Sequence, residues 1–301
     1  MGMTPTVVLT PEQVQYFHDE GFLTLPNITT PEEVSLLRTV FDRLFEQRAG
    51  RAEGAQFDMV GHDDDDAPPA LSQIINPVNY AAELRNTQYR VNATAIARQL
   101  LGPTVTAAFE HAILKPAERG AATPWHQDEA FRVDPDFDYQ QVSIWMPLQE
   151  ATLENGCMEY IPGSNKGEVL GHRSPGSDPK VHAIECAGGF DPASAVPCPL
   201  PPGGATIHHG RTLHHAGPNL TDLPRRAYVL GFEIPPKPSL QPRDFYWNRD
   251  KQTASLDRKR AWRRKGGILV MLSRKFRQGV WRSPGRVLFE IRRALRVLKG
   301  S

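Results

Sequence analysis

The sequence has 301 residues, enough to bury a full hydrophobic core in one large domain or two, and its apolar and charged fractions are those of a globular protein. It has only three cysteines, and its N-terminus lacks a basic segment followed by an apolar run. These features argue against a disulfide-rich secreted protein, and we expect a soluble, cytoplasmic one with free thiols. The longest apolar run, 268–272, is far too short to cross a bilayer.

The N-terminal part contains two sequences typical of helix starts. Thr10-Pro11-Glu12-Gln13 predicts a helix that begins with a capping box and ends by Gly21, and a strand is expected over 22–26. Thr30-Pro31-Glu32-Glu33 predicts a second capping box and a helix that continues to about Arg48. Apolar residues along this second helix form one stripe, which predicts packing against a sheet: Val34, Leu37, Val40, Phe41 and Leu44.

The next region, 49–70, is rich in Gly, Ala and Asp. A calcium loop is the alternative, but the spacing of the aspartates at 63–66 fits no such loop, so an exposed, solvated loop is expected. A helix is then predicted over 86–101. Short strands bounded by Gly and Pro are predicted at 104–114, 123–129, 140–148, 156–161, 204–209, 211–216 and 226–234.

One long segment, 166–201, has little periodicity and much Gly, Pro and Ser. A loop of this length inside a compact domain is usually functional, so it is predicted to form a lid over a binding site. Two histidines in it, His172 and His182, are expected to be solvated.

The stretch 123–128 carries the first candidate metal ligands. Side chains alternate along a strand, so His126 and Asp128 should point to the same side and offer a nitrogen and an oxygen to one point. With one further histidine they would form the 2-His-1-carboxylate triad, which leaves positions open on Fe(II). Because His-x-Asp also occurs by chance, the third ligand decides the interpretation.

Candidates for the third ligand follow a Pro-Gly-Gly turn at 202–204. Arg225 stands eleven residues beyond His214, in a segment that alternates like a strand. A guanidinium near the metal suits a dicarboxylate co-substrate, because it can bind a carboxylate through two hydrogen bonds. Four histidines compete for the ligand position: His208, His209, His214 and His215.

These features, in this order, resemble the phytanoyl-CoA dioxygenase family of Fe(II)/2-oxoglutarate oxygenases over about 9–236, most specifically at 125–128, 155–164 and 209–226. The resemblance implies a mainly β fold with flanking helices around a double-stranded β-helix, a cupin-like jelly roll, which the order of predicted elements also favours. The oxygenase domain would span 1–240 and include the lid, and 241–301 would be a basic, partly helical extension.

The resemblance also selects the third ligand. In the family this histidine precedes a small residue and stands five positions before an asparagine, which selects His214 ahead of Asn219. His215 should then face away from the metal, and His209 should support the turn. Arg225 is the implied anchor for the distal carboxylate of 2-oxoglutarate.

Further co-substrate contacts are implied at Lys115, Gln127 and Trp145, which resemble family residues near 2-oxoglutarate. A surface lysine and a core tryptophan are the alternatives for Lys115 and Trp145. The family often has Ser or Thr two residues after the distal histidine, whereas this chain has Ala216. Another hydrogen-bond donor must therefore replace that hydroxyl.

The implied activity uses Fe(II), 2-oxoglutarate and O₂ to oxidise an unactivated C–H bond of a small-molecule substrate in secondary metabolism, with release of succinate and CO₂. Related halogenases lack the carboxylate ligand, so Asp128 favours hydroxylation, desaturation or ring formation. Phe131 and Arg132 are candidate substrate contacts. The alternatives are a catalytically inactive binding or scaffold protein on the same fold, an acyl-CoA or lipid hydroxylase, and a different metalloenzyme.

The C-terminal extension is strongly basic. Residues 249–301 hold 17 Lys/Arg and 3 Asp/Glu, so the net charge of +1 hides an acidic body and a basic tail. The extension could lie on an anionic membrane surface, contact an acidic carrier protein, or cover the barrel with its charges in water. No recognition module accompanies the charge, so no specific nucleic-acid partner is expected. Its apolar residues form a helical stripe: Val287, Leu288, Ile291, Leu295 and Leu298.

Overall fold

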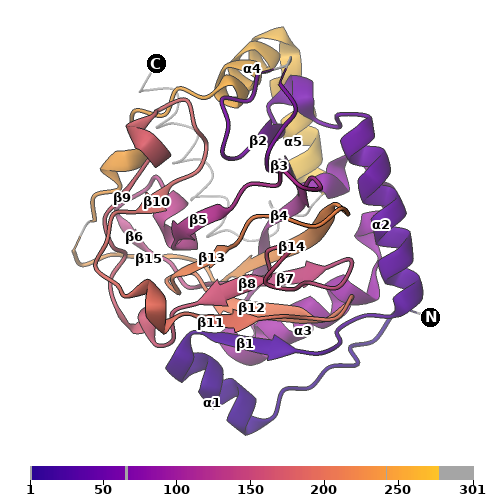
Figure 1. Cartoon of the computed structure of the whole chain (residues 1–301), viewed down its shortest axis with the longest axis vertical. Helices are drawn as coiled ribbons and strands as arrows, with labels where there is room; N and C mark the ends of the chain where they lie inside the picture. The colour runs from indigo at the N-terminus through magenta and orange to yellow at the C-terminus, as the bar shows by residue number, and fades with distance from the viewer. Residues whose placement is uncertain (1, 65–66, 242, 278–301) are drawn as a thin grey trace.

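The computed structural model describes residues 2–64, 67–241 and 243–277, and its centre is a pair of antiparallel sheets (Figure 1). This arrangement confirms the predicted mainly β, jelly-roll fold with flanking helices. The larger sheet contains, in spatial order, β1 (Phe22–Leu25), β12 (Ala205–His209), β7 (Gln141–Pro147), β14 (Arg225–Glu233), β4 (Thr106–Lys115), β3 (Ser72–Ile75) and β2 (Gln56–Asp58). The smaller sheet contains β11 (Val196–Cys198), β8 (Met158–Tyr160), β13 (His214–Ala216) and β5 (Thr123–His126).

The other elements connect or cover these sheets. Two short strand pairs are β9 (His172–Arg173) with β10 (Glu185–Cys186), and β6 (Phe137–Asp138) with β15 (Lys237–Pro238). The α-helices are α1 (Pro11–Glu20), α2 (Pro31–Glu46), α3 (Gln88–Leu101), α4 (Ala254–Trp262) and α5 (Ile268–Arg277). Short helical turns are η1 (Arg51–Glu53), η2 (Pro77–Asn79), η3 (Ala82–Arg85), η4 (Asp128–Phe131), η5 (Ser164–Lys166), η6 (Pro175–Ser177), η7 (Pro192–Ser194), η8 (Tyr246–Asn248) and the π turn η9 (Arg263–Gly267).

Two hydrophobic layers hold the sheets and helices together. The outer layer lies between the larger sheet and α2 and α3 and includes the whole predicted apolar stripe of α2 (Figure 1). The inner layer lies between the two sheets and includes Trp145, Met158 and Val229. Ile144 belongs to the outer layer and its neighbour Trp145 to the inner one, as the alternation along a strand requires.

The helix caps differ in one respect from the prediction. Both halves of the capping box form at α1, between Thr10 and Gln13. At α2 the Thr30 hydroxyl accepts the Glu33 N–H, but the Glu33 carboxylate instead accepts the backbone N–H groups of Gln88 (2.6 Å) and Tyr89 (2.8 Å). Glu33 therefore caps the first turn of α3 and ties the two helices together.

The segment 49–70 is not the exposed loop that its composition predicted. It contains the buried strand β2, and Asp63 is only 6% exposed. The Asp63 carboxylate binds both Arg51 and Arg258, and Arg258 belongs to α4, far along the chain. The long-range ion pair explains the burial, because a paired aspartate can leave water at a much lower cost than an unpaired one.

The lid segment 166–201 is also more firmly packed than expected. Its strand β11 pairs with β8 at the edge of the smaller sheet. The His172 ring is fully buried and accepts the Gln127 N–H at 3.2 Å, and the His182 ring stacks on Phe57 with centroids 3.9 Å apart. The expectation that both histidines are solvated was wrong, because His172 is fully buried and the half-buried His182 packs against Phe57, a residue distant in sequence.

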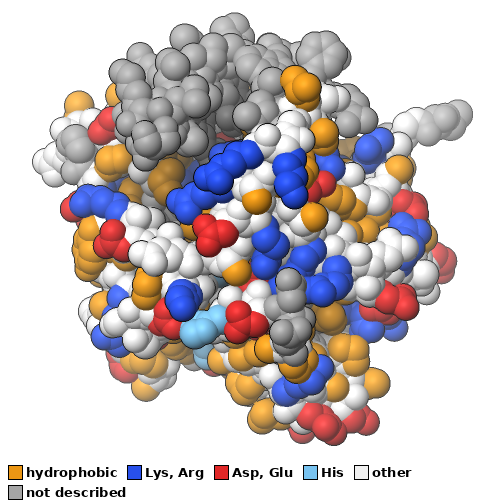
Figure 2. Space-filling model, turned by 90° about the horizontal axis from the view of Figure 1, so that it is seen from above, with side chains coloured by type: hydrophobic (Ala, Val, Ile, Leu, Met, Phe, Trp, Pro, Cys, Tyr) orange, Lys and Arg blue, Asp and Glu red, His pale blue; other side chains and the backbone are white. Residues whose placement is uncertain are grey.

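The described part of the extension, 243–277, packs against the jelly roll. Trp247 and Asn248 donate hydrogen bonds to the Ala130 carbonyl, and Arg274 pairs with Glu53. Figure 2 shows Lys and Arg side chains gathered on the upper face, the end at which α4 lies, and α4 exposes Lys259 and Arg260 there. The predicted stripe of 287–298 lies outside the described residues. Within the described residues, no helix combines the length and apolar character needed to span a bilayer.

Candidate metal centre

His126 and Asp128 lie close together as predicted, but the prediction assumed that both belong to one strand, and they do not. β5 ends at His126 and the turn η4 begins at Asp128, so the strand expected over 123–129 stops between them. The turn nevertheless brings the carboxylate back to the side on which the imidazole lies. His126 Nε2 and Asp128 Oδ1 are 3.6 Å apart.

His214 completes the cluster from the neighbouring strand. β13 pairs with β5 so that His214 lies opposite His126, and its Nε2 is also 3.6 Å from Asp128 Oδ1. The candidate ligand atoms of all three residues lie within 4.8 Å of one another. Ligand atoms that share one ion at about 2.0–2.2 Å are themselves about 3 Å apart, so only a small inward movement is needed.

Backbone carbonyls fix both imidazoles in the tautomer that suits a metal. His126 Nδ1 is 2.8 Å from the Pro124 carbonyl, and His214 Nδ1 is 2.8 Å from the Thr212 carbonyl. A carbonyl only accepts, so each Nδ1 carries the hydrogen and each Nε2 keeps its lone pair for the common point. Burial, followed by the nearby His126 and His208, holds the pKa of His214 well below its usual value, which keeps that ring neutral.

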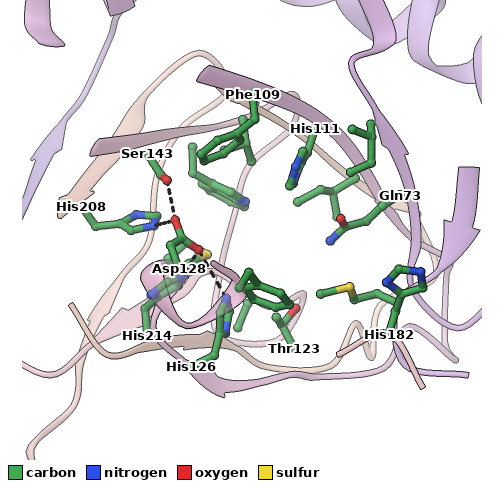
Figure 3. A pocket seen from close by; sticks show the side chains of 18 of the residues that line it. Gln73, Phe109, His111, Thr123, His126, Asp128, Ser143, His182, His208 and His214 are labelled. Carbon is green, nitrogen blue, oxygen red and sulfur yellow. Dashed lines mark hydrogen bonds and ion pairs between the residues drawn. The ribbon is translucent and has the colours of Figure 1, made fainter. Parts of the chain in front are cut away.

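The second oxygen of Asp128 is held by two residues from the larger sheet. Ser143 Oγ donates to Oδ2 at 2.5 Å, and His208 Nε2 lies 3.2 Å from Oδ2 (Figure 3). Burial alone would raise the pKa of Asp128, but the surrounding imidazoles of His126, His208 and His214 hold it well below its usual value. Sequence analysis assigned no role to Ser143 and considered His208 only as a metal ligand.

The two remaining histidines of the 208–215 region point elsewhere, as expected. His215 Nε2 lies 2.9 Å from a carboxylate oxygen of Glu159, and its ring stacks on Trp125 with centroids 4.1 Å apart. His209 Nδ1 accepts the backbone N–H of Arg211 at 3.1 Å and so supports the turn after β12.

Arg225 is buried beside this centre without a partner for two of its nitrogens. The residue is 1% exposed, and its Nε and Nη1 have no hydrogen-bond acceptor in the described part of the chain. Burial lowers its pKa to about 10, and its guanidinium carbon lies 5.4 Å from the centre of the Trp145 ring. A buried cation of this kind is costly unless an anion binds it, so Arg225 fits a ligand carboxylate.

The other predicted co-substrate contacts divide into two groups. Trp145 lines the same cavity as Arg225. Lys115 and Gln127 do not line it: Lys115 Nζ donates to the carbonyls of Ala216 and Gly217, and Gln127 Nε2 donates to the Arg211 carbonyl at 2.7 Å. The structure therefore brings Trp145, but not Lys115 or Gln127, to the cavity wall, because both polar side chains are used to join neighbouring segments.

A cavity of about 390 Å³ opens from the metal cluster (Figure 3). Both predicted substrate contacts, Phe131 and Arg132, line it, and Arg132 is paired with Glu233 at 2.7 Å. Figure 3 shows His182 across the cavity from the metal cluster. Sequence reasoning gave no role to several further polar residues of the wall, among them Gln73, His111, Gln141 and Thr123. Thr123 stands at the start of the stretch 123–128, whereas the other three lie outside any recognisable motif.

Comparison with known proteins agrees with this geometry. The sequence pattern of the phytanoyl-CoA dioxygenase (PhyH) family matches residues 17–227. EvdO2 from Micromonospora carbonacea var. aurantiaca, solved with 2-oxoglutarate, is 40% identical with a TM-score of 0.69, and the match covers 81% of this chain and 99% of that one. A probable alpha-ketoglutarate-dependent hypophosphite dioxygenase of Stutzerimonas stutzeri is 27% identical over 224 residues, 73% of this chain and 77% of that protein. The carbocyclase SnoK from nogalamycin biosynthesis shares the fold at 21% identity, with a TM-score of 0.60 over 79% of this chain and 91% of that one.

Proposed function

This chain belongs to the phytanoyl-CoA dioxygenase family and is an iron- and 2-oxoglutarate-dependent oxygenase. From that premise we propose that His126, Asp128 and His214 bind its Fe(II), and that Arg225 anchors 2-oxoglutarate beside the ion. The observation that carries the proposal is the convergence of two imidazoles and a carboxylate next to a buried guanidinium, whose Nε and Nη1 have no hydrogen-bond partner among the described residues.

The three ligands leave one side of the ion for small molecules. Two imidazoles and one carboxylate would hold the ion as a facial triad, and its remaining positions would be open to small molecules in the cavity that these residues line. Bound Fe(II), with 2-oxoglutarate and O₂, supplies the oxidising chemistry that releases succinate and CO₂ and oxidises a substrate C–H bond. The residues of the chain bind and orient the reactants and exclude water from the site.

Arg225 would bind the distal carboxylate of 2-oxoglutarate through two parallel hydrogen bonds. Trp145 lines the wall beside it. Thr123 replaces the hydroxyl that is missing at Ala216, because it lies opposite Ala216 in the pairing of β5 and β13 and lines the same cavity. Its hydroxyl would donate to the same carboxylate.

The proposed substrate is a small, neutral and partly apolar molecule of secondary metabolism. A volume of about 390 Å³ suits a small molecule that must share the space with 2-oxoglutarate. Apart from Asp128 and Arg225, the charged residue on the described wall is Arg132, and Glu233 neutralises it. An acyl-CoA would bring several phosphates to a wall that has no unpaired cation left for them in the described residues.

The extension is proposed to cover the jelly roll. Ion pairs of Arg258 with Asp63 and of Arg274 with Glu53 support this interpretation for 243–277. Membrane or carrier-protein contact through the basic surface remains an expectation from charge. Co-sedimentation with anionic liposomes of the full chain and of a variant that ends at residue 277 tests it, and equal, weak sedimentation of both would support the covering role.

The proposed function is tested by a screen of candidate metabolites with the iron-loaded protein. We expect one of them to gain an oxygen atom, or to lose two hydrogen atoms, only when 2-oxoglutarate and O₂ are present. A protein that binds Fe(II) but neither binds nor decarboxylates 2-oxoglutarate would refute the proposal.

A further inference from the structure

The two oxygens of Asp128 lie in different surroundings. Oδ1 faces the Nε2 atoms of His126 and His214, both at 3.6 Å, and both histidines come from the smaller sheet. Oδ2 faces Ser143 on β7 and His208 on β12, and both strands belong to the larger sheet. The carboxylate thus stands between the sheets, with one oxygen turned to each.

The contact with the larger sheet is built into its register. Ser143 and His208 are direct partners in the pairing of β7 with β12, so their side chains leave the sheet side by side. Ser143 Oγ lies 2.5 Å and His208 Nε2 lies 3.2 Å from the same oxygen, Oδ2. Both residues are buried, at 1% and 3% exposure, which strengthens their hydrogen bonds to the carboxylate.

The hydrogen positions follow from what a carboxylate can accept. An ionised carboxylate only accepts hydrogen bonds, so His208 Nε2 must carry the hydrogen that points at Oδ2. His208 Nδ1 then has a lone pair, and the Tyr160 hydroxyl, 3.1 Å away, donates to it. Thr206 Oγ1 lies 2.7 Å from the same Tyr160 oxygen and extends the network behind His208.

We propose that Ser143 and His208 are positioning residues that keep Asp128 bound to the metal through Oδ1 alone. The inference rests on the proposed function, since it concerns the same metal centre. A carboxylate that turned to offer both oxygens would occupy one more position on the ion. That position is needed, because a chelating 2-oxoglutarate and O₂ together require three.

The test compares four variants with the wild type. Ser143→Ala and His208→Leu each remove one donor to Oδ2, whereas His208→Gln keeps an N–H group at a similar distance. Ser72→Ala is the matched control, because Ser72 is a buried serine of the same sheet that does not line the cavity. Anaerobic calorimetry measures Fe(II) affinity, the metal-to-ligand charge-transfer absorption measures 2-oxoglutarate affinity, and circular dichroism checks the fold.

We expect Ser143→Ala and His208→Leu to lower Fe(II) affinity by about 10- to 100-fold, the usual effect of losing a residue that orients a metal ligand. Their 2-oxoglutarate affinity should fall as well, while His208→Gln and Ser72→Ala stay close to the wild type. Folded Ser143→Ala and His208→Leu proteins that bind both ligands like the wild type would overturn the proposal. If His208→Gln lost as much Fe(II) affinity as His208→Leu, the assignment of the imidazole N–H as the donor to Oδ2 would be overturned. A wild-type protein that binds neither ligand would instead refute the proposed function.

Discussion

His214 and His126 lie directly opposite each other in the pairing of β13 with β5, with imidazole centroids 4.2 Å apart. Strand register therefore sets the distance between two metal ligands that are far apart in sequence. Because backbone carbonyls also fix both rings through Nδ1, the site needs little rearrangement to bind an ion. The neighbouring His215 has its side chain on the other face of the strand, against Trp125 and Glu159.

This neighbour provides a matched test of the third ligand. We expect His214→Ala to lower Fe(II) affinity by at least about 100-fold, since two ligands hold the ion far less well than three. His215→Ala should bind Fe(II) like the wild type, although loss of the ring stacking will lower its thermal midpoint. Anaerobic calorimetry measures both, and equal Fe(II) affinity in the two variants would show that His214 is not a ligand.

Arg225 should affect stability and co-substrate binding in opposite directions. Arg225→Met removes a buried cation with two nitrogens unpaired in the described part of the chain, so without 2-oxoglutarate the variant should unfold at the same temperature as the wild type or higher. Its 2-oxoglutarate affinity should fall by about 100-fold, because a buried charge-assisted contact is lost. The control is Arg226→Met, whose guanidinium pairs with Asp42 at the surface. Thermal unfolding with and without 2-oxoglutarate measures both effects. If 2-oxoglutarate raised the midpoint temperature of Arg225→Met as much as that of the wild type, the result would contradict this account.

Thr123 tests what replaces the hydroxyl missing at Ala216. Thr123→Val keeps the shape of the side chain and removes its hydroxyl, so we expect about 10-fold weaker binding of 2-oxoglutarate to the iron-loaded protein. Thr123→Ser keeps the hydroxyl and should bind within a few-fold of the wild type. Titration of the charge-transfer absorption measures both constants. Equal dissociation constants of 2-oxoglutarate for Thr123→Val and Thr123→Ser would show that the Thr123 hydroxyl does not contact the co-substrate.

His182 should make the fold sensitive to mild acid. Burial, followed by Lys251 and Lys259, lowers its pKa to about 3 in the folded protein, against about 6.5 when unfolded. As pH falls below about 6.5 the unfolded chain therefore takes up the proton first, and stability is lost by up to about 1.4 kcal/mol per pH unit. His182→Gln cannot take up that proton, so its unfolding free energy should fall less between about pH 7 and pH 5. Urea unfolding at both pH values measures these free energies. An equal loss of unfolding free energy in the wild type and in His182→Gln would contradict the prediction.

The sequence was informative where local chemistry decides the structure. The capping box at Thr10 and the apolar stripe of α2 were read directly from short patterns, and both formed as predicted. The cluster of His126, Asp128 and His214 also came together, although the pattern that suggested it assumed one continuous strand. The resemblance to a family supplied the choice of His214 among four histidines, which spacing alone could not make.

The rest depends on contacts between distant segments. Burial of Asp63 needs Arg258 from α4, and the placement of His182 needs the Thr253 hydroxyl, 3.1 Å from its Nε2. Ser143 and His208 reach Asp128 only because β7 and β12 pair in one particular register. None of these relationships leaves a periodic or local signal in the chain, so they become visible only in the folded molecule.

The central claim is that this centre decarboxylates 2-oxoglutarate. The most direct measurement is succinate formed from 2-oxoglutarate by the iron-loaded protein under O₂, compared between the wild type, His214→Ala and His215→Ala. We predict slow succinate formation without any added substrate in the wild type and His215→Ala, and none above background in His214→Ala. Succinate formation that persists in His214→Ala, or is absent from an iron-loaded wild type, would contradict the account.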